Sequence, residues 1–148
     1  MKGQVSTELL VVVALVLLIF IPLLVLVYVK ANDANQQIAS YQSELAVSRM
    51  ASLANSVGSL GTNTSITTDV YVPPNTIALE TKKAGRGSEI SIKVRTSQGD
   101  SEVAEIVKYP LAAYGTLADA TTAGTWMRIR VSSEYTGGEA VVRIEKVS

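Results

Sequence analysis

The first part of the chain contains a long apolar run. From Leu9 to Val29 every residue is apolar apart from the hydroxyl of Tyr28. As a helix rising 1.5 Å per residue, this run would reach about 30 Å, the thickness of the hydrocarbon core of a membrane. Its apolar residues cover all helix faces, so lipid or other protein must surround it. The run is too long for an ordinary secretory signal and no small-residue cleavage site follows it, so we expect it to be retained.

Pro22 interrupts this run. A proline inside a helix removes one backbone donor and clashes with the carbonyl four residues earlier, here that of Leu18. We therefore predict a helix kink at Pro22, which is either a tolerated feature of a membrane helix or a functional bend.

Beyond Lys30 the pattern changes to a polar helix with an apolar stripe. Ala34, Ile38, Tyr41 and Leu45 follow one another at helical spacing, and apolar residues continue the stripe to about Val57. Glycines at positions 58 and 61 indicate the helix stop, and a single helix over residues 4–60 is predicted. Its outer half can pack on a head while its inner half stays uncovered.

The rest of the chain alternates apolar and polar residues with a period of two, between turn signals. We expect an α+β fold: a long N-terminal hydrophobic α-helix followed by a small antiparallel β-sandwich-like head over residues 61–148. Residues 111–125 show no clear period and are interpreted as a surface loop or as part of an interface between heads. The six expected strands are residues 66–72, 76–81, 88–95, 102–109, 127–133 and 140–147.

Single residues of the head receive an expected environment as well. Tyr109, Tyr114 and Trp126 border the loop, and we interpret them as core residues more readily than as an exposed binding patch. Carboxylates are expected on solvated strand exteriors or strand ends, at Asp69, Glu80, Glu102, Glu105 and Glu134.

Composition excludes several functions. The chain of 148 residues has room for one domain with a helical appendage, and its 13 basic residues balance its 13 acidic ones without clustering. Nucleic acid is therefore not an expected partner. Cysteine and histidine are absent, which removes disulfides, thiolate metal sites and the commonest general base. No phosphate-binding loop, nucleophile elbow or calcium loop is present, so we predict no enzymatic activity, no cofactor and no metal site.

A short polar stretch precedes the apolar run. Met1-Lys2-Gly3 leads into Gln4-Val5-Ser6-Thr7-Glu8, which directly adjoins Leu9. This stretch resembles the class III signal peptide of archaeal type IV pilin-like proteins, which a prepilin peptidase cuts before the glutamine. The resemblance covers the first thirty or so residues. It implies that Gly3–Gln4 is the processing site, that residues 1–3 are a cleaved leader, and that Gln4, Ser6 and Glu8 are recognised.

Glu8 has two compatible interpretations. Near the end of a membrane span a carboxylate costs less than at the centre, and in a first turn it interacts favourably with the helix dipole, with Ser6 or Thr7 capping. The pilin resemblance implies a further role. Cleavage creates an amine at Gln4, and Glu8 of one subunit would pair with the Gln4 amine of an assembled neighbour and set the filament register. If the glutamine cyclises, only a hydrogen bond to Glu8 is left.

The resemblance implies a structural subunit, a pilin, of an archaeal type IV-like adhesive pilus. The expected partners are further copies of the chain in a helical homopolymer, the prepilin peptidase, the membrane platform for pilus assembly, and the membrane before assembly. The expected location is a membrane-inserted precursor and then an extracellular surface filament. The alternatives are a minor pilin, an archaellum-like subunit, or a single-span membrane-anchored surface binding module that does not polymerise.

Archaeal flagellins share this general leader, but they typically have a glycine-rich, threonine-containing mature start that the present chain lacks, so a pilin is preferred. Asn63-Thr64-Ser65 adds a candidate N-glycosylation site at Asn63, and a chance tripeptide explains it equally well.

Overall fold

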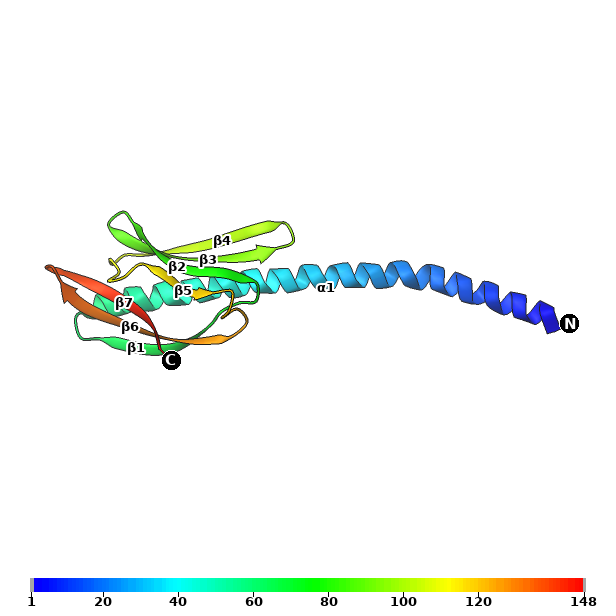
Figure 1. The fold of residues 1–148 in the computed structure, drawn as a ribbon, viewed down its shortest axis with the longest axis horizontal. Helices are drawn as coiled ribbons and strands as arrows, with labels where there is room; N and C mark the ends of the chain where they lie inside the picture. Colours follow the sequence, from blue (N-terminus) through cyan, green and yellow to red (C-terminus); the bar gives the residue numbers. More distant parts are fainter. Residues whose placement is uncertain (1, 148) are drawn as a thin grey trace. The chain divides into compact units, whose positions relative to one another are not determined.

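The computed structural model describes residues 2–147, with side chains described from Ser6 onward. The chain forms two compact units, Met1–Gln37 and Ile38–Ser148. Helix α1 (Lys2–Leu60) contributes to both units (Figure 1). The expected α+β class with a long apolar N-terminal helix is confirmed.

The first unit is helical throughout its described part. Every described side chain from Ser6 to Asn35 is exposed, including the whole apolar run. The helix continues without interruption through Pro22. Within this unit the apolar residues therefore have no protein cover of their own.

The second unit contains the end of α1 and two antiparallel sheets. In the three-stranded sheet the order is β1-β6-β7, and in the four-stranded sheet it is β4-β3-β2-β5. Neighbouring strands pair antiparallel throughout both sheets. The strands are β1 (Ser65–Tyr71), β2 (Thr76–Ala84), β3 (Gly87–Thr96), β4 (Gly99–Val107), β5 (Gly115–Asp119), β6 (Trp126–Thr136) and β7 (Glu139–Val147).

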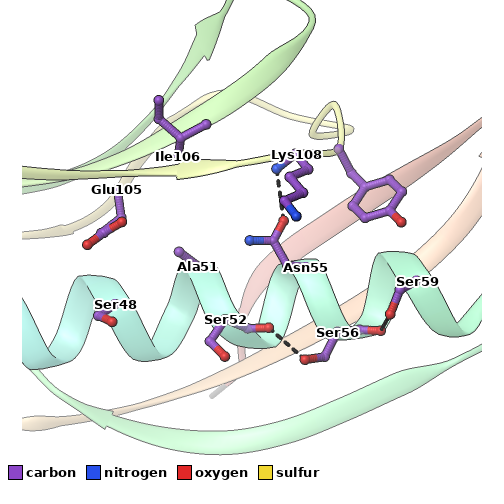
Figure 2. Close-up of a pocket in the computed structure, with 10 residues that line it drawn as sticks. Ser48, Ala51, Ser52, Asn55, Ser56, Ser59, Glu105, Ile106 and Lys108 are labelled. Atoms are coloured by element: carbon purple, nitrogen blue, oxygen red, sulfur yellow. Dashed lines mark hydrogen bonds between the residues drawn. The ribbon is translucent and has the colours of Figure 1, made fainter.

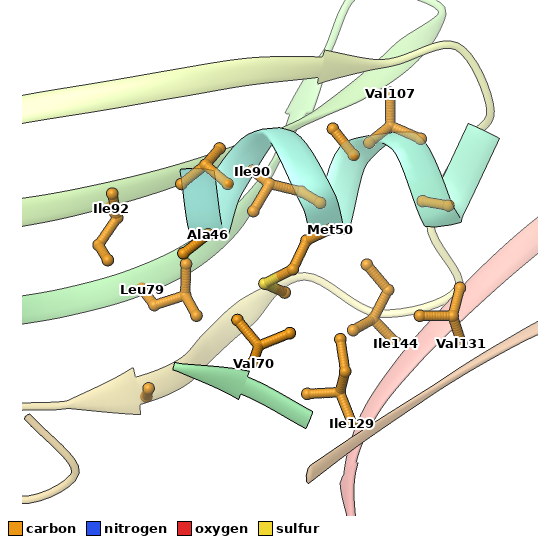
Figure 3. Packing of buried hydrophobic residues seen from close by; sticks show 14 of the residues in the cluster. Ala46, Met50, Val70, Leu79, Ile90, Ile92, Val107, Ile129, Val131 and Ile144 are labelled. Carbon is orange, nitrogen blue, oxygen red and sulfur yellow. The ribbon is translucent and has the colours of Figure 1, made fainter. Parts of the chain in front are cut away.

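The two sheets and the end of α1 enclose one hydrophobic core (Figure 3). Met50 of α1 is fully buried between Ile90 of β3 and Ile129 of β6. Along both strands alternate residues face inward, as the period of two predicts for a sheet with one solvated face. The sandwich-like head is thus completed by a helix rather than by sheets alone.

The buried face of α1 differs from the predicted stripe in its first half. Ile38, Tyr41 and Leu45 are exposed, so this part of the prediction is wrong. The face that packs on the sheets is offset by about one residue and begins with small side chains, Ala39 and Ser43. Small residues let strands approach the helix closely, and that gain in packing outweighs the burial of larger side chains at neighbouring positions. The buried positions in this part of α1 are Ala39, Ser43, Ala46, Val47, Met50, Ala51, Ala54, Val57 and Gly58.

Seven strands replace the six that were expected. The additional strand is β5, which lies inside residues 111–125 and pairs with β2. A register irregularity between Leu79 and Glu80 interrupts this short pairing, and β5 itself contains little apolar alternation. Local sequence therefore carries little signal for β5, and pairing with β2 stabilises it.

Two glycine positions explain how the elements end. Helix α1 ends at Leu60, and Gly61 follows with φ of 92°, a left-handed conformation that suits the residue after a helix. The turn between β6 and β7 contains Gly137 and Gly138, whose φ values are 67° and 93°. Two successive positive φ angles match the twist of a two-residue hairpin, which confirms the predicted return of the chain at this point.

Candidate functional site

The N-terminal part of α1 carries the strongest chemical signal. Glu8 is an exposed carboxylate, and no charged residue follows it until Lys30. The apolar run that follows Glu8 contains no buried residue. By length and composition this helix can cross a membrane, and a helix of this kind suggests membrane insertion.

The residues predicted for processing lie at the edge of the described structure. Gly3 and Gln4 belong to α1 by their backbone, whereas Met1 and the side chains of residues 2–5 lie outside the described residues. Ser6 and Glu8 are both exposed. The scissile bond at Gly3–Gln4 and the pairing of Glu8 with the Gln4 amine both stay predictions.

Pro22 lies among exposed apolar residues of α1. The backbone is helical on both sides of it. The functional kink at this position therefore also stays a prediction.

Asn63 occupies the turn between α1 and β1. Its side chain is exposed and its φ is 64°, in the left-handed region that asparagine tolerates. The backbone N–H of Asn63 donates to the Ser133 carbonyl at 3.0 Å, and the Ser133 N–H donates to the Thr64 carbonyl at 2.9 Å. These bonds hold the tripeptide at the surface of the second unit, where the amide is accessible to modification.

An aromatic groove lies between α1 and the β1–β6 pair, and we define it by Leu45, Tyr71 and Trp126. Its volume is about 240 Å³, and Gln42, Ala46, Arg49 and Val70 complete its lining. The rings of Tyr71 and Trp126 pack with centroids 5.4 Å apart and planes tilted by 56°. Trp126 nonetheless leaves 68% of its surface exposed. Its assignment to the core was therefore wrong, because Trp126 shares the outward-facing phase of β6 with Arg128 and Arg130.

The other two aromatic residues of that group differ from each other. Tyr109 is partly buried and packs against the core, as expected. Tyr114 is 43% exposed, and its hydroxyl lies 3.3 Å from the buried Ser88 Oγ. Tyr114 therefore fixes the loop before β5 and contributes little to the core.

A second, polar groove of about 510 Å³ lies between α1 and β4 (Figure 2). The Asn55 side-chain oxygen accepts a hydrogen bond from the Lys108 backbone N–H at 2.8 Å. Ser56 and Ser59 donate to helix carbonyls of Ser52 and Ser56, so these hydroxyls are already paired. This arrangement ties the edge of β4 to the helix and contains no nucleophile activated by a base.

Glu105 also lines this polar groove. It lies opposite the buried Ile90 in the β3–β4 pairing, and opposed residues share one face of a sheet. Glu105 is exposed, as predicted, but it lies on the face of the sheet that looks toward α1. The groove keeps its carboxylate in water. An inward-facing charge on an edge strand opposes pairing with foreign strands.

Ion pairs cover the outer faces of both sheets. The Arg128 guanidinium donates to Asp69 with its Nε at 2.8 Å, which holds the pKa of Asp69 below its ordinary value. Lys82 lies 3.1 Å from Glu102, and the hydrogen bond raises the pKa of Lys82 and lowers that of Glu102. These residues are solvated strand neighbours, so they stabilise the sheets and do not form a reaction centre.

Within residues 2–147 no group of three metal-ligating side chains comes together. Comparison with known proteins gives no match: no family model, no curated protein and no solved structure resembles this chain closely enough. The functional argument therefore depends on the leader motif, the uncovered helix and the aromatic groove.

Proposed function

We propose that this chain is a structural subunit, a pilin, of an archaeal type IV-like adhesive pilus. One observation carries the proposal. The Gln4-x-Ser6-x-Glu8 stretch, which resembles a class III signal, directly precedes an apolar helix whose described side chains are all exposed. A retained apolar helix behind a cleavable three-residue leader is what the resemblance implies for a polymerising subunit.

The uncovered helix supports two successive environments. Residues 9–29 form an apolar surface on every side of α1. Removing such a surface from water lowers the free energy by about 25 cal/mol per Å². Lipid covers this surface in the precursor. Helices of sister subunits cover it in the filament, so that one apolar segment serves both stages.

Processing would proceed at Gly3–Gln4 through a prepilin peptidase that recognises Gln4, Ser6 and Glu8. The new amine would be the backbone nitrogen of Gln4, at the start of the mature helix. The pair that sets the filament register is the one between this amine and the Glu8 carboxylate of a neighbouring subunit. A membrane assembly platform would bring these subunits together.

The second unit would be displayed outside the cell in this proposal. Its outer sheet faces are covered by ion pairs, which suit a solvated surface. Asn63 is proposed as an N-glycosylation site, supported by its exposure at a turn. Adhesion belongs to the same proposal.

The first experiment determines the mature N-terminus. Mass spectrometry of sheared surface material is expected to show a chain that begins at Gln4, with residues 1–3 removed. Those Glu8→Gln chains that are cleaved are expected to polymerise more slowly, because a neutral amide attracts the Gln4 amine less strongly than a carboxylate does. Glu44→Gln, which changes an exposed acid elsewhere on α1, is the matched control and is expected to polymerise normally. If Glu8→Gln is cleaved and polymerises at the normal rate, the register role is wrong.

The aromatic groove favours a second candidate, a membrane-anchored surface module that binds a ligand without polymerising. An exposed tryptophan packed on a partly buried tyrosine beside a groove is a common feature of binding surfaces. Retention of Met1 in the membrane-bound protein, without filaments, would favour this alternative.

A further inference from the structure

Large apolar side chains continue from the aromatic groove along the outer face of α1. Ile38, Tyr41 and Leu45 are three and four residues apart, so they lie on one helix face. Leu45 also lines the aromatic groove beside Tyr71 and Trp126. We call these five residues the docking face. All five belong to the unit Ile38–Ser148.

The large apolar residues of α1 in the docking face occupy outward positions, whereas the inward positions beside them are small. On the same turns of α1 the inward positions carry the small residues Ala39 and Ser43, while the large apolar residues point outward. Tyr41 is 69% exposed and Leu45 is 70% exposed. Close packing on the head explains the small inward residues, but a helix that packed only on its own head would carry polar residues at the outward positions.

We propose that the docking face receives the apolar segment of α1, residues 9–29, from a second copy of this chain. The inference rests on the proposed function, and it names the surface of the head that the helix of a neighbour contacts. Among the described residues, most exposed large hydrophobic side chains outside the docking face lie within this apolar segment. The others are Leu60, Ile106, Tyr114 and Tyr135. The segment is therefore the complementary surface that every further copy supplies.

The docking face alone is too small for an independent, symmetric pair of heads. Its side chains offer on the order of 400 Å² of exposed apolar surface. Two such faces would bury roughly 800 Å² together, which is less than the roughly 1,000 Å² expected of an independent interface. A contact of face to helix is heterologous, so it can repeat along an open polymer, and packing among the apolar helices adds to it.

Arg49 is the charged residue in the lining of the groove. Arg49 Nη2 donates to Thr68 Oγ1 at 3.0 Å, so the guanidinium already has a partner on β1. Between Leu9 and Val29 the incoming segment carries no charge that would have to be buried. One hydrogen bond to a neutral hydroxyl does not compensate the charge of Arg49, so the docked segment must leave this exposed guanidinium at the solvated edge of the contact.

A photo-crosslinking experiment on the full chain tests the contact. Leu45 is replaced by the photoreactive amino acid p-benzoylphenylalanine, and isotopically light and heavy chains are co-assembled so that cross-links between copies can be recognised by mass. Ile106, which is 66% exposed and lies outside the docking face, carries the same replacement in the control. The expected result is a cross-link from position 45 to residues 9–29 of another copy, and none to that segment from position 106.

The outcomes separate this inference from the proposed function. Filaments with a mature N-terminus at Gln4, but with cross-links from position 45 to lipid, to another protein, to the docking face of a second copy or only within one chain, overturn the docking contact and leave the pilin proposal in place. An absence of filaments overturns the pilin proposal. In that case the same cross-link in membranes would support the contact in a smaller assembly, and its absence there would overturn it.

A pair of substitutions provides an independent readout. Trp126→Ala is expected to lower the yield of filaments, because it removes the largest side chain of the docking face. Ile106→Ala is expected to leave the yield unchanged. Circular dichroism shows whether both variants fold. Normal filament yield from folded Trp126→Ala would contradict the docking face.

Discussion

The ring of Tyr109 packs directly against the backbone of α1 at Gly58. A Cβ atom added at Gly58 would lie about 2.7 Å from two ring carbons of Tyr109, well inside van der Waals contact. Gly58 is buried and helical, two residues before the end of α1. Its role is therefore close packing, whereas Gly61 provides the helix stop.

The substitution Gly58→Ala tests this role, because the sign of the change in unfolding free energy depends on it. At an open helix position alanine stabilises by about 0.5–1 kcal/mol relative to glycine. Here overpacking is expected to destabilise the head by about 1–3 kcal/mol instead. Chemical denaturation of the full chain in detergent, followed by the fluorescence of Trp126, measures the change. The double variant Gly58→Ala/Tyr109→Leu is expected to recover part of the loss, and a stabilised single variant would show that the ring gives way freely.

Two buried serines on the inner strand faces have opposite hydrogen-bond states. Ser133 Oγ finds no hydrogen-bond partner among the described residues. Ser88 Oγ accepts from the Leu111 N–H at 2.9 Å. A buried polar group without a hydrogen-bond partner destabilises the folded state, whereas a paired one stabilises it.

We therefore expect Ser133→Ala to keep or raise the free energy of unfolding, by up to about 1 kcal/mol, and Ser88→Ala to lower it by about 1–3 kcal/mol. The same denaturation experiment compares the two variants, each serving as the control for the other. Equal losses at both sites would contradict the difference in pairing.

At this scale the sequence is informative where the chemistry is local. The order of residues alone places the leader motif, Glu8, Pro22 and the Asn63 tripeptide. The packing role of Gly58 depends on Tyr109, 51 positions further along the chain. The exposure of Trp126, in contrast, follows from the alternation of its neighbours, because Met127 and Ile129 face inward and Trp126 therefore faces outward.

Among the elements, the pairing of β1 with β6 is held by a cross-strand ion pair. Asp69 lies directly opposite Arg128, and the two side chains form two hydrogen bonds, of 2.8 Å and 3.2 Å. The pKa of Asp69 is lowered by the hydrogen bond and the charge of Arg128. A carboxyl group with a lowered pKa in the folded state stabilises that state above its unfolded pKa, and the contribution is lost as pH falls through the folded value.

Asp69→Asn is accordingly expected to lower the midpoint of thermal unfolding at pH 7 and to have no such effect at a pH well below 3.8. The effect at pH 7 is also expected to shrink in high salt, since both side chains are solvated. Glu139→Gln, an exposed acid in none of the ion pairs described for residues 2–147, is the control. A deficit in Asp69→Asn that is equally large at low pH would show that the pair does not act through its charge.

Element boundaries could be predicted wherever the periodicity was strong. Strand β3 and strand β6 alternate clearly and were found close to their expected positions. Strand β5 is short and irregularly paired. It forms because it pairs with β2, and its own residues do not indicate a strand. The buried face of α1 was assigned to the largest apolar residues, but close packing selected the smaller ones at Ala39 and Ser43.

For the whole molecule, the central feature is the division between a covered and an uncovered part. The second unit buries a complete core between two sheets and the end of α1. In the first unit the apolar segment, residues 9–29, has no cover of its own. Composition alone predicts this division, because one run of apolar residues is too long for the head to cover. The apolar segment alone does not identify what covers it. The proposal of polymerisation therefore depends on the leader motif.

Electron microscopy of sheared surface filaments, with helical reconstruction, tests the proposed function most directly. The account predicts that this chain occupies every position of the lattice, that its density begins at Gln4, and that residues 9–29 pack in the filament core with the β-rich unit outside. Filaments built from another protein, or a chain that stays in the membrane with Met1 retained, would contradict it.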